Sequence, residues 1–72
     1  MKESASIWFE TDSDLRQLCG DAQSQARSEG EMDFTREMML EANSKGLLMQ
    51  LSEKQLNWLC KIADWEVPRR RS

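Results

Sequence analysis

The sequence predicts an all-α fold, a small three-helix domain with an extended N-terminal arm. Apolar side chains recur at helical spacing in three stretches. A capping residue precedes each stretch, and glycine or proline follows it. At 72 residues the chain has room for one domain, residues 1–72, with a modest core.

Residues 1–10 are expected to form the arm. Its apolar residues Ile7, Trp8 and Phe9 are dense for a chain end, and we expect them to pack on the helices. Their residue types also favour a strand, but a lone strand has nothing to pair with. An extended segment is therefore the prediction.

The first helix is predicted over residues 12–28. Thr11 and the polar residues after it can cap the helix. The acidic residues Asp12 and Asp14 in the first turn suit the positive end of the helix dipole. Gly20 weakens the helix by about 1 kcal/mol relative to alanine. A single apolar stripe follows at spacings of three and four, comprising Leu15, Leu18, Cys19, Ala22 and Ala26.

The second helix is predicted over residues 33–44, with Asp33 as its cap. Lys45 and Gly46 form a typical C-terminal ending, a cation in the last turn followed by glycine. Beyond them, residues 47–49 continue the apolar run through the connection. The apolar residues of this helix are Phe34, Met38, Met39 or Leu40, and Ala42.

The third helix, residues 53–65, has the clearest start. Ser52 and Gln55 have the spacing of a capping box, and Leu51 is placed to pack on Leu56 as a hydrophobic staple. Pro68 stops the helix, so residues 66–72 are expected to form a solvated basic tail. Two apolar stripes run along the helix: Leu56, Leu59, Cys60 and Ala63 on one, and Trp58, Ile62 and Trp65 on the other.

The residue inventory predicts a protein that is not an enzyme, with no catalytic, cofactor-binding or metal-ligating residues. Histidine is absent, and Cys19 and Cys60 stand 41 positions apart, far from the close pairs of zinc sites. Both cysteines fall on apolar faces, where buried free thiols are typical. We expect reduced thiols and a cytoplasmic protein, and no stretch has the length to span a bilayer.

Charge is distributed unevenly along the chain. Residues 1–33 carry eight acids and three bases, whereas residues 34–72 carry five acids and seven bases. The net charge of the whole chain is −3. An acidic first half argues against nucleic acid as a partner and fits a basic protein, or a surface that mimics a polyanion. Solubility alone also explains the acids.

The three tryptophans offer more apolar surface than a small core needs. One interpretation is that all three fill the core. The other is a partner-binding or homodimer surface, because aromatic and methionine side chains are enriched at interface centres. Its residues would be Trp58, Ile62, Trp65 and Trp8.

A dimeric DNA-binding regulator is the alternative from a different class. The second and third helices could be drawn as a helix-turn-helix, although eight connecting residues are many for that motif. A purely structural homo-oligomer is the third possibility. The nucleic-acid contacts of the DNA-binding alternative would be Lys54, Asn57, Lys61, Arg69, Arg70 and Arg71.

The segment from Phe34 to Ile62 resembles a short helical-hairpin segment of small phage, plasmid and prophage proteins. The shared pattern is an aromatic, a short amphipathic helix, a glycine and then LSxKQxxWLxxI, present here with Met38, Gly46 and residues 51–62. Similar segments in proteins of DNA metabolism look like docking appendages. The resemblance implies a phage or mobile-element accessory protein that binds a host or phage protein, and the acidic half suggests an inhibitor of a nucleic-acid enzyme.

Overall fold

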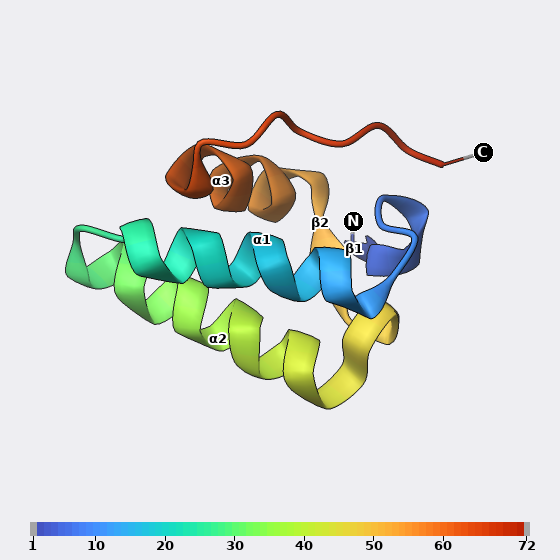
Figure 1. Ribbon diagram of the computed structural model, residues 1–72, viewed down its shortest axis with the longest axis horizontal. Coiled ribbons are helices and arrows are strands. Elements are labelled where there is room, and N and C mark those ends of the chain that lie inside the picture. Colours follow the sequence, from blue (N-terminus) through green and yellow to red (C-terminus); the bar gives the residue numbers. More distant parts are fainter. Residues whose placement is uncertain (1, 72) are drawn as a thin grey trace.

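The computed structural model describes residues 2–71, and this range contains three α-helices and two short strands (Figure 1). The predicted arm and tail each extend one residue beyond the described range. Three helices in the predicted order confirm the mostly α fold, while the strands were not predicted. The helices are α1 (Asp12–Gln25), α2 (Glu29–Lys45) and α3 (Glu53–Ala63). The two 3₁₀ turns are η1 (Ala5–Ile7) and η2 (Gly46–Leu48). The strands are β1 (Lys2–Ser4) and β2 (Gln50–Ser52).

Helix α1 is the centre of the packing, because both α2 and α3 lie against it (Figure 1). The apolar stripe predicted for the first helix is buried from Leu15 to Ala22. In α2, Met39 packs on the core and reaches α1 beside Gly20, whereas Leu40 points to solvent and is 61% exposed. The largest fully buried side chains are Leu15, Leu18, Met49, Leu51, Leu56 and Leu59.

Residues 2–4 of the N-terminal arm form a strand and residues 5–7 form a 3₁₀ turn, whereas an extended segment with no strand partner was predicted. β1 pairs antiparallel with β2, with Glu3 opposite Leu51. The Ser4 hydroxyl donates to the carbonyl of Leu47 at 2.6 Å, and the N–H of Ala5 donates to the carbonyl of Met49 at 2.9 Å. The connection between α2 and α3 therefore supplies the missing strand partner, which no local pattern indicated.

The boundary between α1 and α2 differs from the prediction at both sides. α1 ends at Gln25 rather than residue 28, because Ala26 has an extended backbone. Ser28 caps α2 instead, accepting from the N–H of Glu31 at 3.1 Å, while the Glu31 carboxylate accepts from the N–H of Arg27 at 2.9 Å. α2 therefore begins at Glu29, one turn before the predicted cap at Asp33. Residues 28–31 carry a serine and a glutamate at capping-box spacing, a local signal for the start of a helix.

The end of α2 follows the prediction and adds a contact with α1. Gly46 terminates the helix with φ 58° and ψ −137°, a conformation that side chains with a Cβ rarely adopt. The Asp12 carboxylate at the start of α1 accepts from the N–H of Leu47 at 2.9 Å. A Cβ on residue 46 would lie 2.6 Å from Asp12 Oδ1, so glycine is needed for space as well as for backbone angle.

The predicted capping box of α3 is confirmed. Ser52 Oγ accepts from the N–H of Gln55 at 3.1 Å, and Gln55 Oε1 accepts from the N–H of Ser52 at 2.8 Å. The helix ends at Ala63 rather than residue 65, because Asp64 adopts the left-handed conformation and the N–H of Trp65 turns back to the carbonyl of Cys60 at 2.9 Å.

We expect Ser52→Ala to lower the free energy of unfolding by about 1 kcal/mol, since the substitution removes the acceptor for the N–H of Gln55. Urea unfolding followed by circular dichroism measures the change. Ser44→Ala is the control, because this exposed serine caps no helix and its replacement should have little effect. Equal effects of the two substitutions would contradict the capping role.

The described part of the basic tail is mostly exposed to solvent, and it also contacts the N-terminal arm, which was not predicted. From Trp65 it runs back over α3 toward the N-terminal arm (Figure 1). The Arg70 guanidinium pairs with the Glu3 carboxylate at 2.8 Å. The N–H of Arg71 donates to the carbonyl of Ile7 at 2.6 Å, and its guanidinium lies 3.4 Å from the carbonyl oxygen of Phe9. The N-terminal arm thus supplies acceptors for both arginines, a carboxylate for Arg70 and carbonyl oxygens for Arg71.

Candidate functional site

A pair of stacked aromatic rings joins α2 to α3. The rings of Phe34 and Trp58 have centroids 4.1 Å apart and an interplanar angle of 15°. Trp58 remains 42% exposed, and one helical turn beyond it Ile62 is half-buried. The ring pair separates two hollows that lie between α2 and α3, and we call this whole surface the α2–α3 groove.

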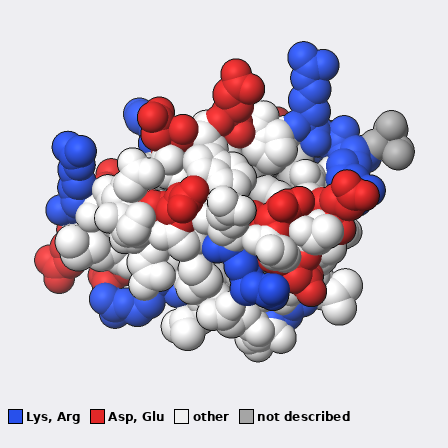
Figure 2. Space-filling view, viewed as in Figure 1, with Lys and Arg blue, Asp and Glu red and all other residues white. Residues whose placement is uncertain are grey.

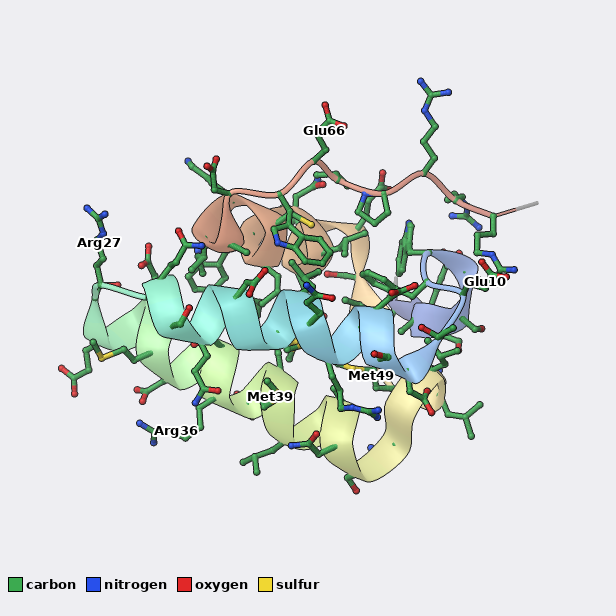
Figure 3. All side chains as sticks on the ribbon, viewed as in Figure 1. Glu10, Arg27, Arg36, Met39, Met49 and Glu66 are labelled. Carbon is green, nitrogen blue, oxygen red and sulfur yellow. The ribbon has the colours of Figure 1, made fainter. Side chains whose placement is uncertain are left out.

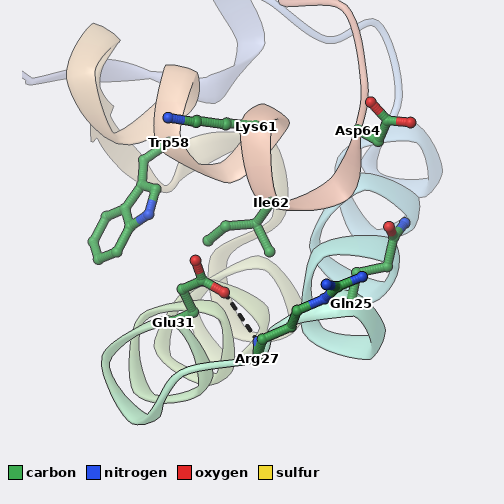
Figure 4. A pocket seen from close by; sticks show the side chains of 7 residues that line it. All are labelled: Gln25, Arg27, Glu31, Trp58, Lys61, Ile62 and Asp64. Atoms are coloured by element: carbon green, nitrogen blue, oxygen red, sulfur yellow. Dashed lines mark hydrogen bonds between the residues drawn. The ribbon is translucent and has the colours of Figure 1, made fainter.

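The larger hollow has a volume of about 460 Å³ and lies at the C-terminal end of α3 (Figure 4). Figure 4 shows Ile62 and Glu31 pointing toward one another across it, with Trp58 at one side. Lys61 extends from α3 above Trp58. The lining combines apolar and charged groups: Gln25, Arg27, Glu31, Trp58, Lys61, Ile62 and Asp64.

The second hollow has a volume of about 200 Å³ and lies at the start of α3. Met38 and Gln55 come from the two helices, and the strands contribute Lys2 and Gln50. On the α2 side, Glu41 pairs with Lys45 at 3.1 Å, whereas Glu37 makes no ion pair within residues 2–71. The α2 residues of the two hollows show that the helices run antiparallel, since Glu31 lies beside Ile62 and Glu41 lies nearer Gln55.

The groove is lined by charges of both signs. The larger hollow contains Arg27, Glu31, Lys61 and Asp64, and the smaller one contains Lys2, Glu37, Glu41 and Lys45. Lys61 makes no ion pair within residues 2–71, so its ammonium group is available to a partner.

Of the four residues predicted to bind a partner, the structure brings only Trp58 and Ile62 together in the groove. Trp8 is a core residue, 6% exposed, because the arm packs on the helices. Trp65 is half-buried, and its indole N–H donates to the Asp21 carboxylate of α1 at 2.8 Å. Phe34, which was not among the predicted partner-binding residues, occupies the place beside Trp58. Its position four residues before buried Met38 could have indicated this face of α2.

The residues of the nucleic-acid alternative are divided between two regions. Lys54, Asn57 and Lys61 are exposed along α3. Arg70 and Arg71 bind the N-terminal arm, and only Arg69 of the three arginines makes no hydrogen bond or ion pair within residues 2–71. Between α2 and α3 the chain forms a 3₁₀ turn and a strand in place of the tight turn of a helix-turn-helix.

The cysteines lie in the core. Burial raises the pKa of both thiols to about 11, so Cys19 and Cys60 are protonated and weakly nucleophilic at neutral pH. Among the described residues, no group of three or more acidic or cysteine side chains is arranged to hold a metal ion. No helix within residues 2–71 has both the length and the apolar character required to cross a bilayer.

Charged side chains on the α1 face are mixed in sign. Figure 2 shows acidic groups interspersed with basic ones, without a single continuous acidic field. Arg36 and Glu66 project outward from α2 and the tail, while Met49 lies inside (Figure 3). On this face the acidic groups are therefore dispersed rather than concentrated at one site.

Fold and surface together define a small helical protein with an aromatic groove open to solvent. No family model matches the chain, and neither a curated protein nor a solved structure is significantly similar to it.

Proposed function

We propose that this chain is a small non-enzymatic accessory protein that binds another protein through the α2–α3 groove. The observation that carries the proposal is Trp58, a large aromatic side chain 42% exposed and held in place by its stack on Phe34. Tryptophan is enriched among the residues that dominate interface energies, and a ring fixed before binding loses little conformational entropy. Ile62 extends the apolar surface into the larger hollow.

The wider context of the proposal is a phage or mobile-element protein acting on a host or phage partner. The resemblance of residues 34–62 to helical-hairpin segments of such elements supports this origin. The excess of acids in residues 1–33 is compatible with an inhibitor of a nucleic-acid enzyme, which must approach a basic surface. Because the acids are dispersed over the α1 face, the groove is the stronger candidate for the contact itself.

Affinity capture from a lysate of a bacterial host tests the proposal. We expect the wild-type chain to retain a specific protein and Trp58→Ala to lose it, since the substitution removes the exposed ring. Leu40→Ala is the matched control, because Leu40 is 61% exposed on α2 but lies outside the groove linings. Circular dichroism of both variants establishes that the helices remain formed. Equal capture by wild type and Trp58→Ala would reject the groove as the binding surface.

The DNA-binding alternative rests on the exposed side chains Lys54, Asn57 and Lys61 of α3. It requires affinity for duplex DNA that falls steeply with salt and disappears when Lys54 and Lys61 are replaced by glutamine. Capture of duplex DNA without any protein would favour that function over the proposed one.

A further inference from the structure

We propose that residues 65–71 form a salt-sensitive strap, which holds the N-terminal arm closed over the helices and opens together with it while the helices stay folded. The inference concerns the two ends of the chain and stands whether or not the α2–α3 groove binds a partner. Its basis is the set of contacts that Arg70 and Arg71 make with the arm, at the opposite end of the sequence.

The strap is fixed at its two ends and free between them. At its start, the indole N–H of Trp65 donates to a carboxylate of α1 at 2.8 Å. At its far end, Arg70 pairs with Glu3 at 2.8 Å, and Arg71 binds carbonyl oxygens of the arm through its backbone N–H and its guanidinium. Residues 66–69 make no hydrogen bond or ion pair within residues 2–71, so only the two ends keep the strap in place.

The strap spans the whole length of α3 and is close to fully extended (Figure 1). Arg70 lines a hollow together with residues 52–54, at the start of α3, whereas Trp65 follows the end of that helix. A helix with the 11 residues of α3 is about 16 Å long. The five steps from residue 65 to residue 70 reach only about 17 Å when extended. The arm therefore cannot move away from the anchor at Trp65 unless Arg70 and Arg71 release it.

The arm itself is held by few other contacts. β1 pairs with β2 at three positions, and Ser4 and Ala5 each donate one hydrogen bond to the segment before β2. The arm also buries Trp8 and Phe9, which are 6% and 5% exposed. Short terminal segments open at a lower free energy than packed helices do. We therefore infer an opened state in which arm and strap are released and these two aromatic rings are uncovered.

The ion pair makes the strap responsive to salt. The Arg70 side chain is 61% exposed and the Glu3 side chain is 31% exposed. Dissolved ions screen a pair between exposed groups much more than they screen a buried one. Rising ionic strength should therefore loosen the strap and increase the population in which Trp8 and Phe9 are uncovered.

Hydrogen exchange of single backbone amides, followed by nuclear magnetic resonance, tests the inference. The reporter is the N–H of Ala5, which donates to the carbonyl of Met49 at 2.9 Å and is released when the arm opens. In the wild type we expect this amide to have a lower protection factor than the amide of Leu59 inside α3, because the arm opens without the helices. Equal opening free energies at the two amides would overturn the separate opening of the arm.

The contribution of the strap is tested in the variant Arg70→Gln. We expect the protection factor of Ala5 to fall about two- to fivefold, the effect of losing one exposed ion pair. Arg69→Gln is the matched control, because it removes the same charge from the strap at a residue without a hydrogen bond or ion pair within residues 2–71. The same protection factor in both variants would overturn the role of the strap.

Exchanging the two charges and raising the salt concentration complete the test. Glu3→Arg and Arg70→Glu should each lower the protection of Ala5, and the double variant should restore it to within about twofold of wild type. Sodium chloride at about 1 M should lower the protection more in wild type than in Arg70→Gln, because only wild type has the pair to screen. A double variant without recovery, or an equal salt response in the two proteins, would contradict the salt-sensitive strap.

Discussion

Leu59→Ala is expected to lower the free energy of unfolding by about 2–5 kcal/mol, because it removes a fully buried side chain from the core face of α3. Leu59 lies on the stripe that packs against α1, between Leu56 and Ala63. Small domains have little stability to lose, so the variant should be partly unfolded at 37 °C. Urea unfolding followed by tryptophan fluorescence measures the change.

Leu40→Ala is again the control, since it removes the same atoms from an exposed site and should change stability by less than about 0.5 kcal/mol. A loss below about 1 kcal/mol for Leu59→Ala would mean that the core lies on another face of α3.

Gly46→Ala is expected to cost about 2–4 kcal/mol, from a strained backbone and a displaced hydrogen bond. With φ 58° and ψ −137°, residue 46 has a conformation that alanine rarely adopts. The new Cβ would meet Asp12 Oδ1 at 2.6 Å and push the carboxylate away from the N–H of Leu47. Thermal and urea unfolding of the variant measure the cost.

Two further variants separate these causes. Asp12→Ala removes the colliding carboxylate together with its hydrogen bond to Leu47, so Gly46→Ala should cost less in that background, and the cost that remains is the backbone strain. Gly30→Ala is the control for glycine removal, because a Cβ there meets nothing within 4 Å inside α2, and the helix should be unchanged or stabilised by up to about 1 kcal/mol. A similar loss at both glycines would contradict the special role of Gly46.

The three helices and most of their ends could be predicted because residues close together in the sequence specify them. The caps at Thr11 and Ser52 and the ending at Gly46 all lie where the sequence placed them. The start of α2 was missed because Ser28 was taken as the end of the previous helix, although serine and glutamate at capping-box spacing mark a beginning. The ends of a helix can be predicted from a local pattern when residues at those ends make the capping hydrogen bonds.

The candidate site was predicted only in part. Trp58 and Ile62 share a helix, so helical periodicity alone placed them on one face. Trp65 lies beyond the left-handed residue Asp64, where the periodicity no longer applies, and its ring contacts α1 through Asp21. Trp8 and Phe34 stand on other elements, and their positions depend on how those elements pack.

The sequence by itself determined three amphipathic helices, most of their ends and the face of each that is buried, because hydrogen bonds and side-chain spacing within a few residues specify them. Only the tertiary structure decided the contacts between distant segments: β1 on β2, the tail arginines on the arm, and Phe34 on Trp58. Each joins residues more than twenty positions apart, and such pairs form only when the packing of all three helices brings them together. The groove proposed to bind a partner is one of these products of packing.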